Sequence, residues 1–297
     1  MAKREYEKGR LVLLWAVLLA SALPSRGQLQ TSFKVGLNSA RMDGPSEVDL
    51  DDAALERWRN ITGFMLGVGF GYAFTDAIGV RAELVYSRRG AKYTFDGPSY
   101  RIFRHSAGST EARGLSRYLI SIQNTYIDLP LLAYGRWKNF EFSAGAYGGL
   151  LVQSTGEGSL TFSNGRTVPL GNVVRDLEFN LQHNYRKDKP GRGDESERVS
   201  VQVDSRAVDM PKTLGAYYDY PEGSGKLYRA IDYGLLGGVS YYMSRSLFLG
   251  VRFQYGLADI TNEKGDIAKG QTDNGNLIYR NDHDRNLLWQ FSVGFGF

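Results

Sequence analysis

The last eleven residues of the chain, 287–297, alternate with a period of two. In the run LLWQFSVGFGF, apolar side chains such as Trp289, Phe291 and Val293 fall on one side of an extended chain, and mostly small or polar residues fall on the other. Successive side chains of a β-strand point to opposite faces, so this segment predicts a strand with one continuously apolar face. The same alternation predicts seven further strands, at 32–38, 63–74, 78–86, 118–134, 140–150, 227–243 and 247–258.

The segment 63–74 shows what kind of sheet this is. Its apolar set runs from Phe64 to Phe74, and the opposite set is nearly all glycine and alanine. A glycine face would weaken a strand in a soluble sheet, whereas inside a narrow barrel it leaves room for long side chains of neighbouring strands. The chain also lacks any apolar run near the length of a transmembrane helix. The pattern therefore favours a transmembrane β-barrel.

The connections between these strands alternate between short and long. The short ones are 75–77, 135–139 and 244–246, and the long ones are 39–60, 96–117, 154–227 and 259–284. Short periplasmic turns and long extracellular loops are typical of bacterial outer-membrane barrels. We therefore expect an all-β fold: one antiparallel up-and-down transmembrane β-barrel domain over 28–297, with eight strands, closed by its N- and C-terminal strands.

Two segments are ambiguous. In 154–227, the alternating stretches 177–181 and 199–203 flank a charged run, and they predict either a hairpin that projects beyond the membrane or two extra transmembrane strands, which would make ten. We favour the hairpin because both stretches are short in apolar residues. In 118–134, Ile120 and Ile122 are out of phase with Ile127 and Leu129. Either a bulge near 123–125 or a first part standing above the membrane would explain this.

The N-terminal 27 residues resemble an export signal. Basic residues precede an apolar run at 11–20, and small residues follow, as in a cleaved secretory signal peptide. This leader holds five basic and two acidic residues, which leaves 31 basic and 30 acidic residues in the mature chain. A net charge near zero argues against a nucleic-acid partner. The absence of cysteine excludes disulfides and thiol chemistry.

Charged residues on the inward-facing side of the predicted strands are nearly balanced in sign. An eight-stranded barrel is just wide enough to be filled by side chains, so we expect these residues to form an ion network that plugs it. A proton or ion path is the alternative. The predicted network consists of Lys34, Arg81, Glu83, Asp128, Glu141, Asp232 and Arg252.

Aromatic residues near the ends of the predicted strands suit the two membrane interfaces. A soluble, lipocalin-like ligand barrel is the alternative, but it would turn its apolar residues inward. The predicted interface set is Tyr72, Phe74, Tyr86, Tyr134, Tyr241, Tyr255, Trp289 and Phe297.

Few residues suggest catalysis or metal binding. The three histidines, His105, His183 and His283, all fall in predicted loops, and only the run 282–284 (DHD) resembles an acid–histidine pair. The chain contains no GxSxG or HExxH motif. Acidic groups at 47–52 and 273–276 lack the spacing of a calcium loop, so we expect solvated surface there. We predict no catalytic residue, metal or cofactor.

Several stretches resemble the PorT-like outer-membrane β-barrel family of Bacteroidetes. They are FKVGLN at 33–38, YIDLPLL at 126–132, IDYGLLGG at 231–238, LGVRFQYGLADIT at 249–261 and the terminal strand. The resemblance implies an eight-stranded barrel in the outer membrane of a Gram-negative bacterium, surrounded by lipid and lipopolysaccharide. It also implies that Phe297 and the last strand are recognised by the barrel-assembly machinery. Some family members are linked to protein secretion.

These observations predict a structural or binding role exercised through the extracellular loops, with an unknown ligand. A secretion or assembly component that engages periplasmic partners is one alternative. A hydrolase that uses a loop histidine is the other.

Overall fold

The computed structural model describes residues 28–49, 51–273 and 275–297, and the expected signal peptide at 1–27 lies outside these ranges. No helix in the described part of the chain is long and apolar enough to cross a membrane. The strands are β1 (Gln28–Asp43), β2 (Glu56–Arg59), β3 (Ile61–Ala73), β4 (Ile78–His105), β5 (Gly108–Trp137), β6 (Phe140–Val168), β7 (Val173–Val174), β8 (Leu177–Asn184), β9 (Gly193–Val203), β10 (Arg206–Leu214), β11 (Ile231–Tyr242), β12 (Leu247–Gly256), β13 (Ile267–Asp273), β14 (Asn276–Tyr279) and β15 (Arg285–Gly296).

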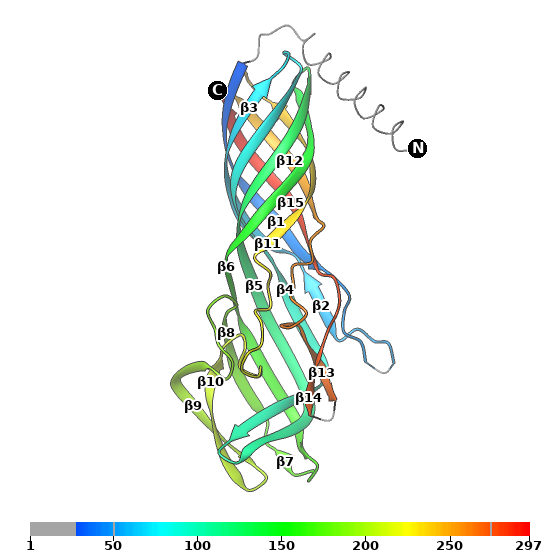
Figure 1. The fold of residues 1–297 in the computed structure, drawn as a ribbon, viewed down its shortest axis with the longest axis vertical. Helices are drawn as coiled ribbons and strands as arrows, with labels where there is room; N and C mark the ends of the chain where they lie inside the picture. Colours follow the sequence, from blue (N-terminus) through cyan, green and yellow to red (C-terminus); the bar gives the residue numbers. More distant parts are fainter. Residues whose placement is uncertain (1–27, 50, 274) are drawn as a thin grey trace, which may run out of the picture.

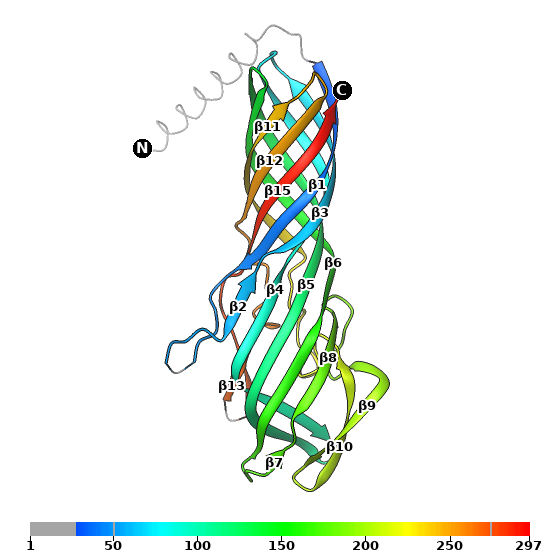
Figure 2. The same cartoon turned by 180° about the vertical axis from the view of Figure 1, so that it is seen from behind.

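Eight of these strands close into a barrel (Figures 1 and 2). Their hydrogen-bonded order is β11, β12, β15, β1, β3, β4, β5 and β6, and β6 pairs with β11 to complete the ring. The first and last ring strands in sequence pair antiparallel, with Val35 opposite Val293 and Leu37 opposite Phe291. The predicted eight-stranded barrel, closed by its terminal strands, is confirmed. The ten-strand alternative is wrong.

The outer face of the ring is apolar because each strand alternates as its sequence predicts. On β3, every second residue from Phe64 to Tyr72 is exposed, and the intervening Met65, Gly67, Gly69 and Gly71 are buried. This apolar stretch has close to the 9–11 residues that a tilted strand needs to cross the hydrocarbon core. Equivalent exposed apolar residues lie on the other ring strands.

Three ring strands are far longer than a membrane requires. β4, β5 and β6 have 28, 30 and 29 residues, and they continue past the ring as one sheet (Figure 1). The expected loop at 96–117 is therefore wrong, because β4 and β5 pair continuously from Val85–Asp128 to His105–Gly108. Polar residues outside the membrane can still form backbone hydrogen bonds between strands. Because these strands do not face lipid, their sequences lack the alternation that identified the ring strands.

The region 154–227 is also largely strand. β6 extends to Val168, β8 pairs antiparallel with β6, and β10 pairs parallel with β8. β9 forms its hairpin with β10 rather than with β8, so the predicted pairing of 177–181 with 199–203 is wrong. Both stretches lie outside the ring, as the favoured reading of this segment predicted.

The phase change in 118–134 has a simple origin. Ile120 and Ile122 are buried on the same side of β5 as Asp128, so β5 keeps one parity throughout. Its first half stands beyond the ring and turns its apolar residues inward. A register shift does occur between Thr125 and Tyr126, but the extra residue is Val152 on β6.

We call the part beyond the ring the extension: residues 44–60, 88–125, 151–230 and 257–284. Figure 1 shows the segments around 215–230 and 257–284 lying along the long sheet. The loop expected at 259–284 contains the hairpin β13–β14, and the loop expected at 39–60 contains the end of β1 and the short strand β2, which pairs with β4. The extension has its own hydrophobic core, which includes Phe95, Phe103, Leu160, Phe179 and Val201.

Candidate functional site

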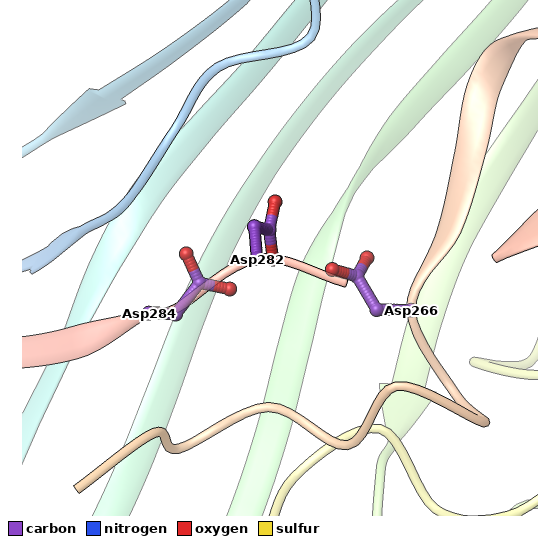
Figure 3. Close-up of side chains that lie close together, drawn as sticks. All are labelled: Asp266, Asp282 and Asp284. Carbon is purple, nitrogen blue, oxygen red and sulfur yellow. The ribbon is translucent and has the colours of Figure 1, made fainter. Parts of the chain in front are cut away.

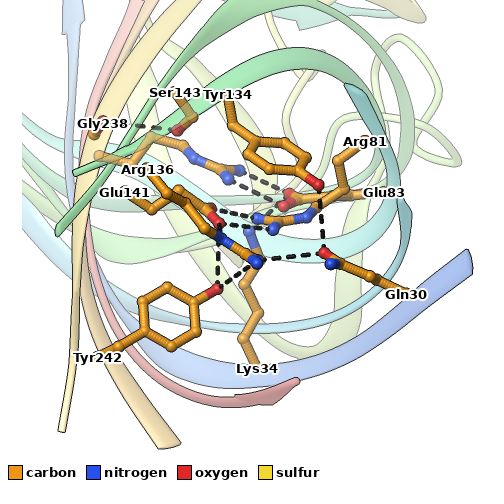
Figure 4. A network of polar contacts seen from close by, with 11 residues as sticks. Gln30, Lys34, Arg81, Glu83, Tyr134, Arg136, Glu141, Ser143, Gly238 and Tyr242 are labelled. Carbon is orange, nitrogen blue, oxygen red and sulfur yellow. Dashed lines mark hydrogen bonds and ion pairs between the residues drawn. The ribbon is translucent and has the colours of Figure 1, made fainter. Parts of the chain in front are cut away.

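The half of the barrel interior nearer the short connections holds a buried ion network (Figure 4). Glu83 of β4 accepts hydrogen bonds from Lys34 Nζ at 2.6 Å and from both terminal nitrogens of Arg252 at 2.7 and 3.0 Å. Arg81, two residues earlier, makes a bidentate pair with Glu141 at 2.7 and 3.0 Å. Such fork-to-fork pairs are strong and fix the orientation of both side chains.

Glycines on the facing strand make this network possible. A Cβ at Gly67 would lie 3.1 Å from Cε of Lys34, and one at Gly69 would lie 3.3 Å from Cδ of Arg81. The glycine face of β3 thus holds space for the long cationic side chains that cross the interior.

Two members of this network were missed by the sequence analysis, and one residue was misplaced. Arg136 donates to Glu141 at 3.0 Å and to Gln30 at 3.1 Å, and Tyr242 donates to Glu141 at 3.1 Å. Tyr134, expected at the outer interface, is only 4% exposed and lies inside the barrel (Figure 4). Its hydroxyl donates to Gln30 at 3.2 Å, and its ring lies under the guanidinium of Arg81.

A second ion cluster lies in the half of the interior nearer the extension. Arg89 pairs with Asp128 at 2.8 Å and with Asp232 at 3.4 Å, and its guanidinium stacks 3.8 Å from the centre of the Tyr126 ring. Asn286 and Tyr147 also donate to Asp232, at 2.9 and 3.2 Å. All seven residues of the predicted network therefore take part in ion pairs, and Arg89 joins them although the sequence analysis ended its strand at residue 86.

The remaining predicted interface aromatics point outward. Tyr72, Tyr86, Tyr241, Tyr255 and Trp289 share the parity of the outward residues on their strands. Phe74 and Phe297 follow directly after β3 and β15. Their place at the membrane interfaces stays a prediction.

The extension encloses a cavity of about 120 Å³. Its wall is rich in aromatic rings from β2, β4 and β5 and from the segments after β8 and β10. These aromatic lining residues are Trp58, Tyr93, Tyr100, Tyr118, Tyr185, Tyr218, Tyr220 and Tyr228.

Hydrogen bonds within the wall hold several of these tyrosines. The hydroxyl of Tyr93 donates to Glu56 at 2.6 Å, that of Tyr100 to the carbonyl of Ala268 at 3.0 Å, and that of Tyr220 to the carbonyl of Gly265 at 2.7 Å. Because these hydroxyls are already engaged, the rings contribute chiefly apolar surface to the cavity.

Two arginines of the cavity wall are paired with acidic residues of the same wall. Arg101, only 1% exposed, donates to Asp219 at 2.7 Å and to Tyr118 at 3.3 Å. Arg280 donates to Glu56 at 2.8 Å. Burial favours the neutral form of Glu56, but Lys269 and Arg280 outweigh it, so the pKa of Glu56 is lowered. The cavity therefore combines apolar rings with fixed ion pairs at its edge.

The three histidines lie apart and do not form a catalytic group. His105 sits at the end of β4 beside Thr110, at 3.2 Å. His183 lines the cavity, and burial lowers its pKa to about 3, so it is neutral at physiological pH. His283 is exposed, and within the described ranges no hydrogen bond joins it to Asp282 or Asp284.

The acidic loop at 47–52 is only partly solvated surface. The carboxylate of Glu47 accepts hydrogen bonds from the backbone nitrogens of Lys269 and Gly270, at 2.9 and 2.7 Å. Asp49 accepts bonds from the backbone of Asp51 and Ala53 and so caps its own loop. Glu47 therefore ties this loop to β13.

Comparison with known proteins defines the class. The family model for the outer membrane protein beta-barrel domain matches residues 20–262, so the chain belongs to this family of outer-membrane proteins. No curated protein matches the chain.

Three solved structures illustrate the likeness of fold. The attachment invasion locus protein Ail of Yersinia pestis is 11% identical, with 90% of this chain and 98% of that one covered and a TM-score of 0.32. Neisserial surface protein A is 12% identical, with 91% and 97% covered and a TM-score of 0.32. OprG from Pseudomonas aeruginosa is 13% identical, with 90% and 95% covered and a TM-score of 0.29. Likeness at this level says nothing about what this chain binds.

Proposed function

We propose that this outer-membrane protein is a cell-surface binding protein whose ligand enters the aromatic cavity of the extension. The cavity carries the proposal. A preformed, mostly apolar pocket with a few fixed polar groups is the usual form of a small-molecule site. The short connections of the ring face the periplasm in barrels of this kind, which supports a position of the extension outside the cell.

The cavity limits the ligand to a small, largely apolar molecule. A volume of about 120 Å³ is close to that of a protein cavity that accepts benzene, so one aromatic ring fits. The charges at its edge suit a ligand with one polar group. A phenol or a related single-ring compound has this chemistry.

In this proposal the barrel is a plugged anchor. Eight strands enclose a space that side chains can fill, and the two ion clusters lie across it. A secretion role with periplasmic partners finds less support, because the connections at that end have only four, two and four residues, at 74–77, 138–139 and 243–246. The hydrolase alternative lacks an assembled acid–histidine pair.

Several expectations from the sequence belong to the same proposal. They are a cleaved signal peptide, membership of the PorT-like group of Bacteroidetes, contact with outer-membrane lipid and lipopolysaccharide, and recognition of the last strand by the barrel-assembly machinery. They are supported by the leader, by the stretches quoted above and by the apolar outer face.

Binding of 4-fluorophenol, followed by fluorine NMR on the full chain folded in detergent, tests the function. We expect saturable binding by the unaltered protein and its loss in Ala216→Phe, because Ala216 lines the cavity and a phenyl group would fill it. The matched control is Ala107→Phe, at an exposed turn between β4 and β5. An identical response from all three proteins would show only partition into detergent and would refute the proposed site.

A further inference from the structure

Three aspartates converge in the extension from both ends of the β13–β14 hairpin (Figure 3). Asp266 immediately precedes β13, whereas Asp282 and Asp284 follow β14. One carboxylate oxygen from each residue lies within 4.8 Å of the other two. Calcium–oxygen distances are about 2.3–2.6 Å, so oxygens on opposite sides of one ion are up to about 5 Å apart. A single calcium ion can therefore reach all three.

The Asp266 carboxylate and one oxygen of Asp282 lack the hydrogen-bond donors that buried acids normally have. Asp266 is only 9% exposed, and no described residue donates a hydrogen bond to its carboxylate. Oδ1 of Asp282 is fully buried and also has no hydrogen-bond partner. A buried carboxylate oxygen without a donor or a cation is costly. Oδ1 of Asp282 is such a group, and it lies near the Asp266 carboxylate, which has no donor, so the two together point to a missing cation.

Cationic residues nearby do not neutralise this group. Arg280 lies 2.6 Å from Oδ2 of Asp282, but it also pairs with Glu56 at 2.8 Å. Among the described residues, only Arg280 forms an ion pair with any of the three carboxylates, and it shares its charge with Glu56. Acidic side chains are therefore in excess where the three aspartates meet.

We propose that Asp266, Asp282 and Asp284 bind one divalent cation, and that the ion is calcium. All three ligands are hard oxygen donors, which suit Ca²⁺ or Mg²⁺ rather than Zn²⁺ or Cu²⁺. Calcium accepts irregular coordination by several carboxylates, whereas Mg²⁺ demands near-octahedral geometry. Thr261 donates its hydroxyl to Oδ2 of Asp284 at 2.9 Å and so holds that carboxylate in place.

The ion would fasten the β13–β14 hairpin at its base. Asp266 and Asp284 belong to the cavity wall, and the next residue, Arg285, begins β15. Calcium would therefore connect the wall of the cavity to the strand that closes the ring. This site does not depend on the aromatic ligand, so either proposal can fail without the other.

Terbium luminescence on the full chain in detergent is the test, because Tb³⁺ occupies calcium sites and is excited by nearby tyrosines. Tyr220 and Tyr228 are close enough to interact electrostatically with Asp266 and Asp284 respectively. We expect a saturable signal at one ion per chain that Ca²⁺ displaces. We also expect about a tenfold or greater loss of affinity in Asp266→Asn and Asp284→Asn.

The matched control is Asp51→Asn, in the exposed acidic loop, which should bind as the unaltered protein does. Heat-modifiable migration on gels shows that each variant is folded. If a variant does not fold, the result for the unaltered protein tests the site by itself. A one-to-one terbium signal that Ca²⁺ displaces supports the site, and the absence of that signal overturns the proposal. Equal terbium affinity in folded Asp266→Asn would also overturn the proposed site. So would carboxylates that share a proton and bind no metal.

Discussion

Whether a single residue points into the barrel is predicted better by its parity along the strand than by its residue type. Parity placed Arg81 and Glu83 inside, where they pair with Glu141 and with Lys34 and Arg252. Arg89 has the same parity and was missed only because its strand was expected to stop at residue 86. Tyr134 shares its parity with Asp128, and assigning it to the interface gave its aromatic character priority over the pleat. Parity alone would have found both residues.

Replacement of Glu83 by glutamine should destabilise the barrel strongly. The change leaves Lys34 and Arg252 without their common carboxylate in a buried site, and breaking such a pair typically costs about 3–5 kcal/mol. Glu197→Gln removes an exposed partner of Lys212 and should cost no more than about 1 kcal/mol. Guanidinium unfolding of both variants in detergent measures the difference. Equal free energies of unfolding would mean that the interior pairs do not hold the barrel together.

At the scale of elements, the sequence predicts the membrane-spanning strands of the ring but not the strands of the extension. Lipid on one side and packed side chains on the other impose alternation on each ring strand, so all eight could be found. Beyond the ring, β4, β5 and β6 lose the lipid-facing half of that pattern, and turn-rich polar stretches such as 96–117 resemble loops. The parallel pairing of β8 with β10 joins residues about thirty positions apart and leaves no local signal.

Deletion of residues 175–205, with a short Gly-Ser linker in their place, should show whether the barrel folds independently of the extension. The deletion removes all of β8 and β9, neither of which belongs to the ring. We expect heat-modifiable migration to persist and 4-fluorophenol binding to disappear, because Leu181 and His183 of the cavity wall are lost. A matched deletion of Phe291–Phe297 should abolish folding, since β15 pairs with both β1 and β12. Loss of folding in the first variant would mean that the barrel needs the extension.

At the scale of the whole molecule, the two parts have opposite designs. The barrel is apolar outside and charged inside, whereas the extension is polar outside and has an apolar core. They meet near Arg89 and Tyr126, where the ion cluster of Arg89 lies against the barrel end of that core. The apolar exterior and charged interior of the barrel could be predicted from the sequence, because membrane burial constrains every ring strand. Sequence reasoning could not place the cavity, whose wall combines residues from Pro45 to Asp284 that only the folded sheet brings together.

The arrangement of the interior ion pairs predicts that the barrel has no open pore. Described interior residues carry five cations, Lys34, Arg81, Arg89, Arg136 and Arg252, and four acids, Glu83, Asp128, Glu141 and Asp232, joined by ion pairs at two heights. An ion would have to break these pairs to pass, and the extension's core stands beyond them. We therefore expect no large, stable single-channel conductance in planar bilayers, with an open porin as the positive control. Stepwise conductance from the purified protein would show that the interior pairs open, and the barrel would then be a channel rather than an anchor.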